Sequence, residues 1–205
     1  MFGLTKVSVV QCNLQHSRAA TATLCRRLDV EQGTLALIQE PWVVKSRISG
    51  LNKLTGRIFS TPNTYRPRTA IYTPRHIKTQ PLQHLSTSDL TAVEVECVVK
   101  GKLTVVVIAL VYLPESSATP PPTREMEELV AHCRTQKWEL IIACDTNSHH
   151  VSWGSEDNNT RGKSLYDYIN VNNLCISSRG CVPTFVNSRS QTLIDVTLTT
   201  ARILM

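Results

Sequence analysis

Short apolar runs of strand length, several of them ending on a polar side chain, are the feature that most constrains the fold of this chain. The run at 103–113 contains VVVIALVYL, which is β-branched and apolar enough for the centre of a sheet. Many strands with few helices between them predict an α/β sandwich with mixed sheets, in place of a regular βαβ winding. We predict strands at 7–12, 35–39, 69–72, 90–99, 103–113, 139–144, 174–177, 184–186 and 193–198, and helices at 18–29, 124–136 and 162–172.

The segment WELIIACDTNSHHVSWG (138–154) is the most informative of these runs, because its apolar part stops on Asp145, Asn147, His149 and His150. Side-chain alternation along a strand predicts that Asp145 and Asn147 point to the same face. A carboxylate beside a carboxamide can hold a divalent cation or a phosphate oxygen. The same residues also suit an ordinary Asx turn. A zinc site is disfavoured, since adjacent histidines do not share a face of a regular element.

The length and composition are those of one intracellular domain. A chain of 205 residues can bury a sizeable core as a single domain, and it contains no run of 18 apolar residues and no signal-peptide pattern. We therefore expect a soluble protein that does not associate with membranes. The seven cysteines are odd in number and several lie inside apolar runs, which predicts reduced thiols.

The net charge of +6 is unevenly distributed. No Asp or Glu occurs between Pro41 and Ser88. A basic block beside acidic strand ends indicates a polyanionic ligand, although a solvated basic face without a partner is equally compatible. The block comprises Lys45, Arg47, Lys53, Arg57, Arg66, Arg68, Arg75 and Lys78.

The polar residues at the strand ends are those that metal-assisted phosphodiester cleavage requires. Carboxylates bind the metal or orient the attacking water, and neutral donors hold the phosphate. Asp195 lies in the apolar run LIDVTL, where a buried carboxylate would need a compensating partner. The candidates are Asn13, Glu40, Tyr112, Asp145, Asn147 and Asp195.

Six motifs resemble the apurinic-type endonuclease domain of arthropod sequence-specific non-LTR retrotransposons, within the endonuclease/exonuclease/phosphatase superfamily. The resemblance covers residues 5–200, and DTNSHHVSWG and TLIDVTL are its most specific parts. It implies a four-layered α/β sandwich in which two packed mixed sheets are flanked by helices. The motifs are LIQEPW (37–42), RPRTAIY (66–72), DTNSHHVSWG (145–154), NNTRG (158–162), VPTF (182–185) and TLIDVTL (192–198).

The resemblance also implies an activity. It is that of a Mg²⁺- or Mn²⁺-dependent endonuclease that nicks double-stranded DNA in the nucleus and leaves a 3′-hydroxyl primer. The reverse transcriptase domain of the same polyprotein would extend that primer.

Roles for individual residues follow from the same resemblance. Glu40 would be the main metal ligand, with Asn13 beside it, and Tyr112 would bind the scissile phosphate. Asp145 would act near the leaving oxygen, Asn147 would orient the phosphate, and Asp195 would orient a catalytic histidine.

Further residues are candidates for contacts with DNA. The resemblance places Thr184 and Thr192 against the DNA backbone. Arg66, Arg68, Arg161 and His149 are additional candidates, with a solvated loop, a plain turn and a packing role as their respective alternatives.

The chain departs from the family at one point. It contains no Ser-Asp-His tripeptide after the strand that holds Asp195, so we expect a single domain, residues 1–205, that is truncated at its C-terminus and lacks the final strand. Such a fragment could bind DNA yet cleave it poorly. Two other functions therefore stay open, a catalytically impaired DNA-binding module and a phosphoesterase of the same fold that acts on another phosphate ester.

Overall fold

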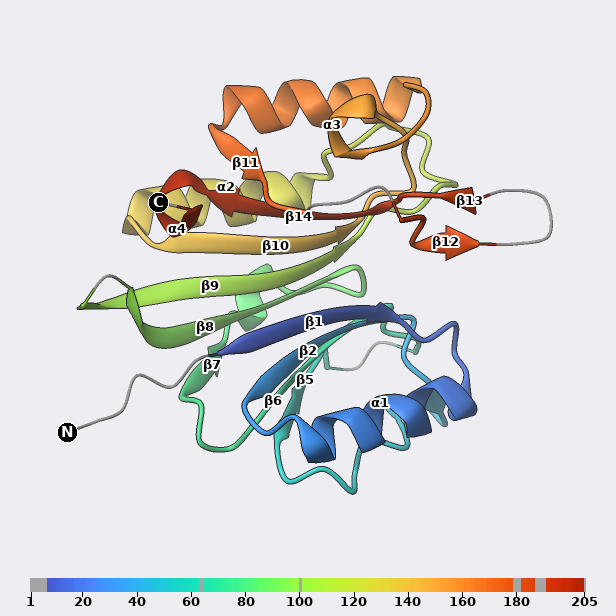
Figure 1. Cartoon of the computed structure of the whole chain (residues 1–205), viewed down its shortest axis with the longest axis vertical. Helices are drawn as coiled ribbons and strands as arrows, with labels where there is room; N and C mark the ends of the chain where they lie inside the picture. Colours follow the sequence, from blue (N-terminus) through green and yellow to red (C-terminus); the bar gives the residue numbers. More distant parts are fainter. Residues whose placement is uncertain (1–6, 63–64, 100, 179–181, 187–190, 205) are drawn as a thin grey trace. The chain divides into compact units, whose positions relative to one another are not determined.

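The computed structural model describes residues 7–62, 65–99, 101–178, 182–186 and 191–204 (Figure 1). The chain divides into two compact units, Met1–Leu110 (unit 1) and Val111–Met205 (unit 2). The boundary falls inside one strand, β9 (Lys102–Tyr112).

Unit 1 is built on a four-stranded sheet with the order β1-β2-β6-β5. Strands β1 and β2 are parallel, and the helix α1 connects them and covers one face of the sheet (Figure 1). The helix begins where Ser17 Oγ accepts a hydrogen bond from the N–H of Ala20 at 3.2 Å. Its Leu24 and Leu28 pack on Ile38 in the core of this unit. The elements are β1 (Ser8–Asn13), α1 (Arg18–Val30), β2 (Thr34–Gln39), β5 (Arg57–Phe59) and β6 (Thr69–Thr73).

A second set of strands in unit 1 packs against this sheet. Strand β6 contacts β8, and the buried hydroxyl groups of Thr69 and Thr91 lie 2.8 Å apart between the two strands. The order of this set is β9-β8-β7. Its members are β7 (Thr79–Pro81), β8 (Leu90–Val99) and β9; the short hairpin β3 (Val43–Val44) with β4 (Arg47–Ile48) and the 3₁₀ helix η1 (Gln83–Leu85) complete the unit.

Unit 2 contains three antiparallel strands in the order β11-β14-β10, with helices packed against them (Figure 1). Helix α2 packs on β10, and α3 packs on β11. Thr123 caps α2, and Glu125 and Glu127 in its first turn complement the helix dipole. The elements are α2 (Arg124–Gln136), β10 (Glu139–Asp145), η2 (Val151–Trp153), α3 (Thr160–Val171), β11 (Leu174–Ile176), β12 (Phe185–Val186), β13 (Gln191–Thr192), β14 (Asp195–Thr200) and α4 (Ala201–Leu204).

The predicted mixed α/β fold is confirmed, and three corrections to the predicted elements bear on the site. Helix α3 begins at Thr160 instead of Gly162, because Asn159 caps it. The last strand begins at Asp195 and not at Leu193, because the N–H groups of Ile194 and Asp195 both donate to Thr184 Oγ1.

The third correction concerns β10, which ends at Asp145. The alternation that was to place Asn147 on the same face as Asp145 therefore does not apply. Asn147 instead lies in a loop with a left-handed φ of 42°.

Two other sequence expectations concern the whole chain. The six cysteines that the structure describes are free thiols, and Cys181 lies outside the described residues. Within the described ranges, no helix combines the length and the apolar character needed to cross a bilayer.

Candidate active site

The first group of predicted site residues lies where β1 and β2 end in unit 1. Asn13 is paired in register with Gln39, the residue before Glu40. The N–H of Leu14 donates to the carbonyl of Gln39 at 2.9 Å, and Asn13 Oδ1 accepts from the N–H of Gln15 at 2.8 Å. The parallel pairing thus brings Asn13 and Glu40 to one edge of the sheet, as the sequence predicted.

Glu40 is held in an unusual backbone conformation. Its φ is 43°, in the left-handed region that costs an L-residue about 1–2 kcal/mol. Two hydrogen bonds fix it: its N–H donates to the carbonyl of Arg68 at 2.8 Å, and its carbonyl accepts from the N–H of His16 at 2.9 Å. Strain of this kind gathers at functional sites.

The Glu40 side chain suits a cation that needs few protein ligands. It is half-buried, and among the described residues no side chain or backbone group forms a hydrogen bond or ion pair with its carboxylate. The described part of the chain also contains no cluster of three or more His, Cys, Asp or Glu residues that could hold a metal. One carboxylate with a neighbouring amide fits Mg²⁺, which keeps most of its waters, better than Zn²⁺, which needs several protein ligands.

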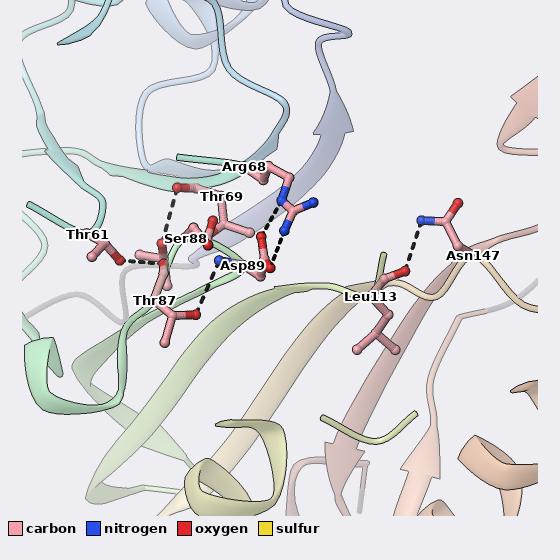
Figure 2. A network of polar contacts seen from close by, with 9 residues as sticks. Thr61, Arg68, Thr69, Thr87, Ser88, Asp89, Leu113 and Asn147 are labelled. Atoms are coloured by element: carbon pink, nitrogen blue, oxygen red, sulfur yellow. Dashed lines mark hydrogen bonds and ion pairs between the residues drawn. The ribbon is translucent and has the colours of Figure 1, made fainter. Parts of the chain in front are cut away.

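The basic block is partly neutralised inside unit 1. Arg68 donates from Nε and Nη2 to the two carboxylate oxygens of Asp89 (Figure 2). Lys78 pairs with Glu96 at 2.6 Å, and Arg57 donates to the hydroxyl of Thr79 at 2.6 Å. Acidic residues from outside the acid-free stretch therefore pair with some of its cations. All three of these cations have structural partners.

Arg66 and Arg68, both predicted to face DNA, differ in the structure. Arg66 is exposed, with its guanidinium 5.9 Å from the centre of the Tyr65 ring. Arg68 is half-buried and bound to Asp89. The role of Arg68 in DNA contact stays a prediction, and the structure gives this residue a second role, in holding the segment that bonds Glu40.

The second group of predicted residues lies in unit 2, where β10 ends. Asp145 and Asp195 occupy directly opposite positions on the antiparallel strands β10 and β14. Side chains at such positions share a face and approach within about 5 Å. Asp145 is buried, whereas Asp195 is half-exposed and not buried as the apolar run LIDVTL suggested.

Tyr112 and Asn147 lie beside this pair of aspartates. The N–H of Leu113, the residue after Tyr112, donates to the carbonyl of Asp145 at 2.9 Å. Asn147 Nδ2 donates to the carbonyl of Leu113 at 3.2 Å, the contact drawn in Figure 2. The structure thus brings together Tyr112, Asp145, Asn147 and Asp195, four of the predicted residues, in one unit.

The two predicted threonines support the chain where β14 begins. Thr184 is exposed, yet its hydroxyl accepts the N–H groups of Ile194 and Asp195 at 3.2 and 3.1 Å. Thr192 pairs with Phe185 between β12 and β13. Thr184 thus fixes the backbone that carries Asp195, and the DNA contacts of both threonines stay predictions.

The two histidines after Asn147 have structural partners. His149 Nδ1 lies 2.8 Å from a carboxylate oxygen of Asp157. The ring of His150 stacks on Tyr166 with 4.2 Å between ring centres and also contacts Trp153, and its Nδ1 accepts the N–H of Ser152. Burial lowers the pKa of His150 below its usual value, with a further lowering by Lys163 and an opposing effect of Asp167. These contacts fit the packing role that the sequence left open for this pair.

Arg161 lies in the first turn of α3 and donates to main-chain carbonyls near the end of β10. Its Nε donates to the carbonyl of Asn147 at 3.3 Å, and its Nη2 donates to that of Leu113 at 3.4 Å. Burial lowers its pKa, against an opposing effect of Glu115.

Sequence reasoning missed several residues that support the two groups. Asp89 is the first acidic residue after the acid-free stretch, and this position could have suggested it as an ion-pair partner for a cation of that stretch. Asn159 has the side chain of a helix cap, three residues before Gly162. The carbonyl of Leu113 gave no signal, because its role depends on a residue 48 positions away.

Comparison with known proteins finds one family model that matches part of the chain and several solved nucleases that share its fold. Residues 106–205 match the family model described as "Endonuclease-reverse transcriptase". The endonuclease domain of TRAS1, a telomere-specific non-LTR retrotransposon, aligns with a TM-score of 0.79 and 24% identity over 97% of this chain and 87% of that chain. The resemblance predicted from the sequence is confirmed by this family match and by the shared fold.

More distant structures share the fold at lower identity. An AP endonuclease from Archaeoglobus fulgidus has a TM-score of 0.63 and 12% identity over 95% of this chain and 87% of that chain. TDP2 from D. rerio, complexed with a single-stranded DNA product, has a TM-score of 0.54 and 12% identity over 95% and 83%. No curated protein sequence matches the chain significantly.

Proposed function

We propose, from this endonuclease-type fold and the match to the endonuclease-reverse transcriptase family, that the chain is a divalent-metal-dependent endonuclease that nicks double-stranded DNA. The nick would leave a 3′-hydroxyl that primes reverse transcription by a reverse transcriptase domain of the same polyprotein. Chromosomal DNA as the substrate implies a nuclear location.

The observation that carries the proposal is the position of Asp145 opposite Asp195. Like charges directly opposite each other on adjacent strands are destabilising. Asn147, which follows on a left-handed turn, adds a carboxamide at the same place. A fold does not retain such a combination for stability, whereas phosphodiester hydrolysis needs groups of this kind.

Glu40 supplies the carboxylate that the proposal assigns to the metal. The group is half-buried and available, and Asn13 offers an amide oxygen on the adjacent strand. When bound, a divalent cation would neutralise charge that develops on the phosphate.

The remaining roles belong to side chains of unit 2. Tyr112 and Asn147 would donate hydrogen bonds to the scissile phosphate, since a phenol and a carboxamide carry donors without charge repulsion. Asp145 would hold the proton that passes to the leaving oxygen, and Asp195 would orient a neighbouring donor.

The substrate class is inferred from cations that form no ion pair within the described residues. Lys45, Arg47 and Arg66 lie in the basic block, and none of them pairs with an acid of the described residues. A polyanionic backbone is the ligand that such cations favour.

Nicking of supercoiled plasmid tests the proposal. We expect open-circular product with Mg²⁺ or Mn²⁺ and none with EDTA. Salt-dependent DNA binding without nicking would instead indicate a DNA-binding module. Phosphate release from a phosphoinositide or a small phosphomonoester, with intact plasmid, would indicate a phosphoesterase of another specificity.

A further inference from the structure

The hydrogen bonds of Arg161 differ from those expected of a side chain that binds DNA phosphates. Two of its three guanidinium nitrogens donate to main-chain carbonyls, Nε to Asn147 and Nη2 to Leu113. The third, Nη1, is buried and has no hydrogen-bond partner among the described residues. One nitrogen is thus buried and the other two are turned toward main-chain carbonyls, an arrangement that fits a structural role better than a contact with DNA.

The carbonyls that Arg161 binds belong to the two segments that carry predicted catalytic side chains. Leu113 follows Tyr112, and its carbonyl also accepts Asn147 Nδ2 at 3.2 Å. Its N–H donates to the carbonyl of Asp145 at 2.9 Å. Arg161 therefore closes a set of hydrogen bonds that ties the end of β9 to the loop after β10.

These hydrogen bonds matter because Asn147 adopts a left-handed turn. With a φ of 42°, the residue presents its carbonyl toward Arg161 and its amide toward Leu113. Relaxation to an ordinary φ would turn the carboxamide away from its present position. The bond from Arg161 Nε opposes that relaxation.

The segment around Arg161 is rigidly attached to the same loop. Asn159 Oδ1 accepts the N–H groups of Gly162 at 2.7 Å and His149 at 3.2 Å, and the N–H of Asn159 donates to the carbonyl of His149. Asn158 Oδ1 accepts the N–H of Val151 at 2.8 Å. The motif NNTRG is thus a scaffold for the motif DTNSHHVSWG.

Gly162 shows how close this attachment is. A Cβ built on Gly162 would lie 1.9 Å from the carbonyl oxygen of His149, a distance that no side chain can occupy. Only glycine permits the helix to approach the loop so closely, and this approach brings the Arg161 guanidinium to Asn147.

We propose that Arg161 is a positioning residue, which fixes the Asn147 turn through its guanidinium fork and is not a ligand of the DNA phosphates. The inference rests on the proposed nuclease function for its consequence in catalysis. Its structural part, the control of the Asn147 side chain, is independent of that function.

The test compares Arg161→Lys with Arg161→Met. Lysine keeps the charge but cannot bond two carbonyls in a planar fork. We expect both variants to lower the single-turnover nicking rate at saturating protein by about 100-fold, the cost of a small misplacement of a catalytic group. We expect the DNA dissociation constant, and the slope of its logarithm against the logarithm of salt concentration, to stay unchanged.

Two outcomes would overturn the proposal. Wild-type nicking by Arg161→Lys, with loss only in Arg161→Met, would show that charge alone matters. A salt slope reduced by about 1 in Arg161→Met would show that the residue neutralises a phosphate. The matched control is Arg124→Met, which removes an exposed arginine of α2 that pairs with Glu128 in unit 2.

A second readout separates this proposal from the function on which it rests. In ¹⁵N-resolved NMR spectra we expect Arg161→Lys to shift the side-chain amide resonances of Asn147, while resonances of α2 stay in place. If the wild-type protein does not nick DNA, the proposed function fails and this readout still decides the positioning role. An unchanged Asn147 amide in a folded Arg161→Lys variant would refute it.

Discussion

The tip of β2 in unit 1 and the tip of β10 in unit 2 each contain a left-handed turn, and different contacts stabilise the two turns. Each strand is followed by a polar residue in the left-handed region, Glu40 with a φ of 43° and Asn147 with a φ of 42°. Glu40 is held by hydrogen bonds of its own backbone to Arg68 and His16. Asn147 is held by two side chains, its own carboxamide and the guanidinium of Arg161.

The two supporting arginines show what the difference means. The guanidinium of Arg68 is bound to a carboxylate, and its backbone carbonyl accepts the N–H of Glu40. The guanidinium of Arg161 is itself the support and binds carbonyls alone. The turn at Glu40 should therefore tolerate loss of its arginine side chain, whereas the turn at Asn147 should not.

Gly162→Ala should have the largest effect of the substitutions considered, because it displaces the NNTRG segment that supports the tip of β10 and does not affect the tip of β2. The clash with the carbonyl of His149 should lower the free energy of unfolding by roughly 3 kcal/mol, the cost of severe overpacking. Chemical denaturation measures this loss. Gly101→Ala is the matched control: its φ is 77°, but apart from its chain neighbours no atom of the described residues lies within 4 Å of the new Cβ, so we expect a loss of only about 1 kcal/mol. Equal losses would refute the close-approach argument.

Glycine substitutions at the two tips should separate their energetics. Glu40→Gly relieves a left-handed glutamate and should raise the free energy of unfolding by roughly 1 kcal/mol. Asn147→Gly should give no gain, because asparagine tolerates this region and its bond to Leu113, worth about 1 kcal/mol, is lost. Both variants should lose nicking activity. A larger gain at Asn147 than at Glu40 would contradict the account.

Arg68→Met should have a smaller effect than its ion pair suggests. Both partners are partly exposed, so the pair contributes less than about 1 kcal/mol and should weaken with salt. We expect thermal unfolding of Arg68→Met and Asp89→Asn to differ little from the wild type at high salt. A loss that exceeds 2 kcal/mol, on the scale of a buried charge, would mean that the pair supports the Glu40 turn directly.

The smallest expected effect is a pH dependence from unit 2. Burial lowers the pKa of His150 in the folded state, so below about pH 6.5 the unfolded state binds more protons. The stability is complete above that pH and should fall as the pH drops toward the folded-state pKa. His150→Phe, which retains an aromatic ring against Tyr166, should remove this part of the slope between pH 5 and 7.

Much of the fold was predictable because its signals are local. The apolar run at 34–39 is buried along its whole length, and the caps Ser17 and Thr123 begin the helices that follow them. The position of Glu40 and Asp145 at strand ends was likewise predictable, since each stands at the end of an apolar run.

The supporting contacts were not predictable, because they join segments far apart in the sequence. Asp89 neutralises a residue 21 positions before it, and Arg161 reaches back 48 positions to Leu113. The conformation of Asn147 also escaped prediction, because strand alternation assumes that β10 continues past Asp145. The motif NNTRG looked like a plain turn in the sequence, whereas in the structure its side chains bind the loop that carries Asn147.

Single-turnover nicking by variants of the two tips tests the central claim most directly. The account predicts that Glu40→Gln in unit 1 and Asp145→Asn in unit 2 each reduce Mg²⁺-dependent nicking by at least about 100-fold, the scale of a lost catalytic group. Glu31→Gln, at the exposed end of α1, should keep the wild-type rate. Nicking that persists at the wild-type rate in either tip variant, or that continues in EDTA, would contradict the claim that Glu40 and Asp145 are each required for a metal-dependent reaction.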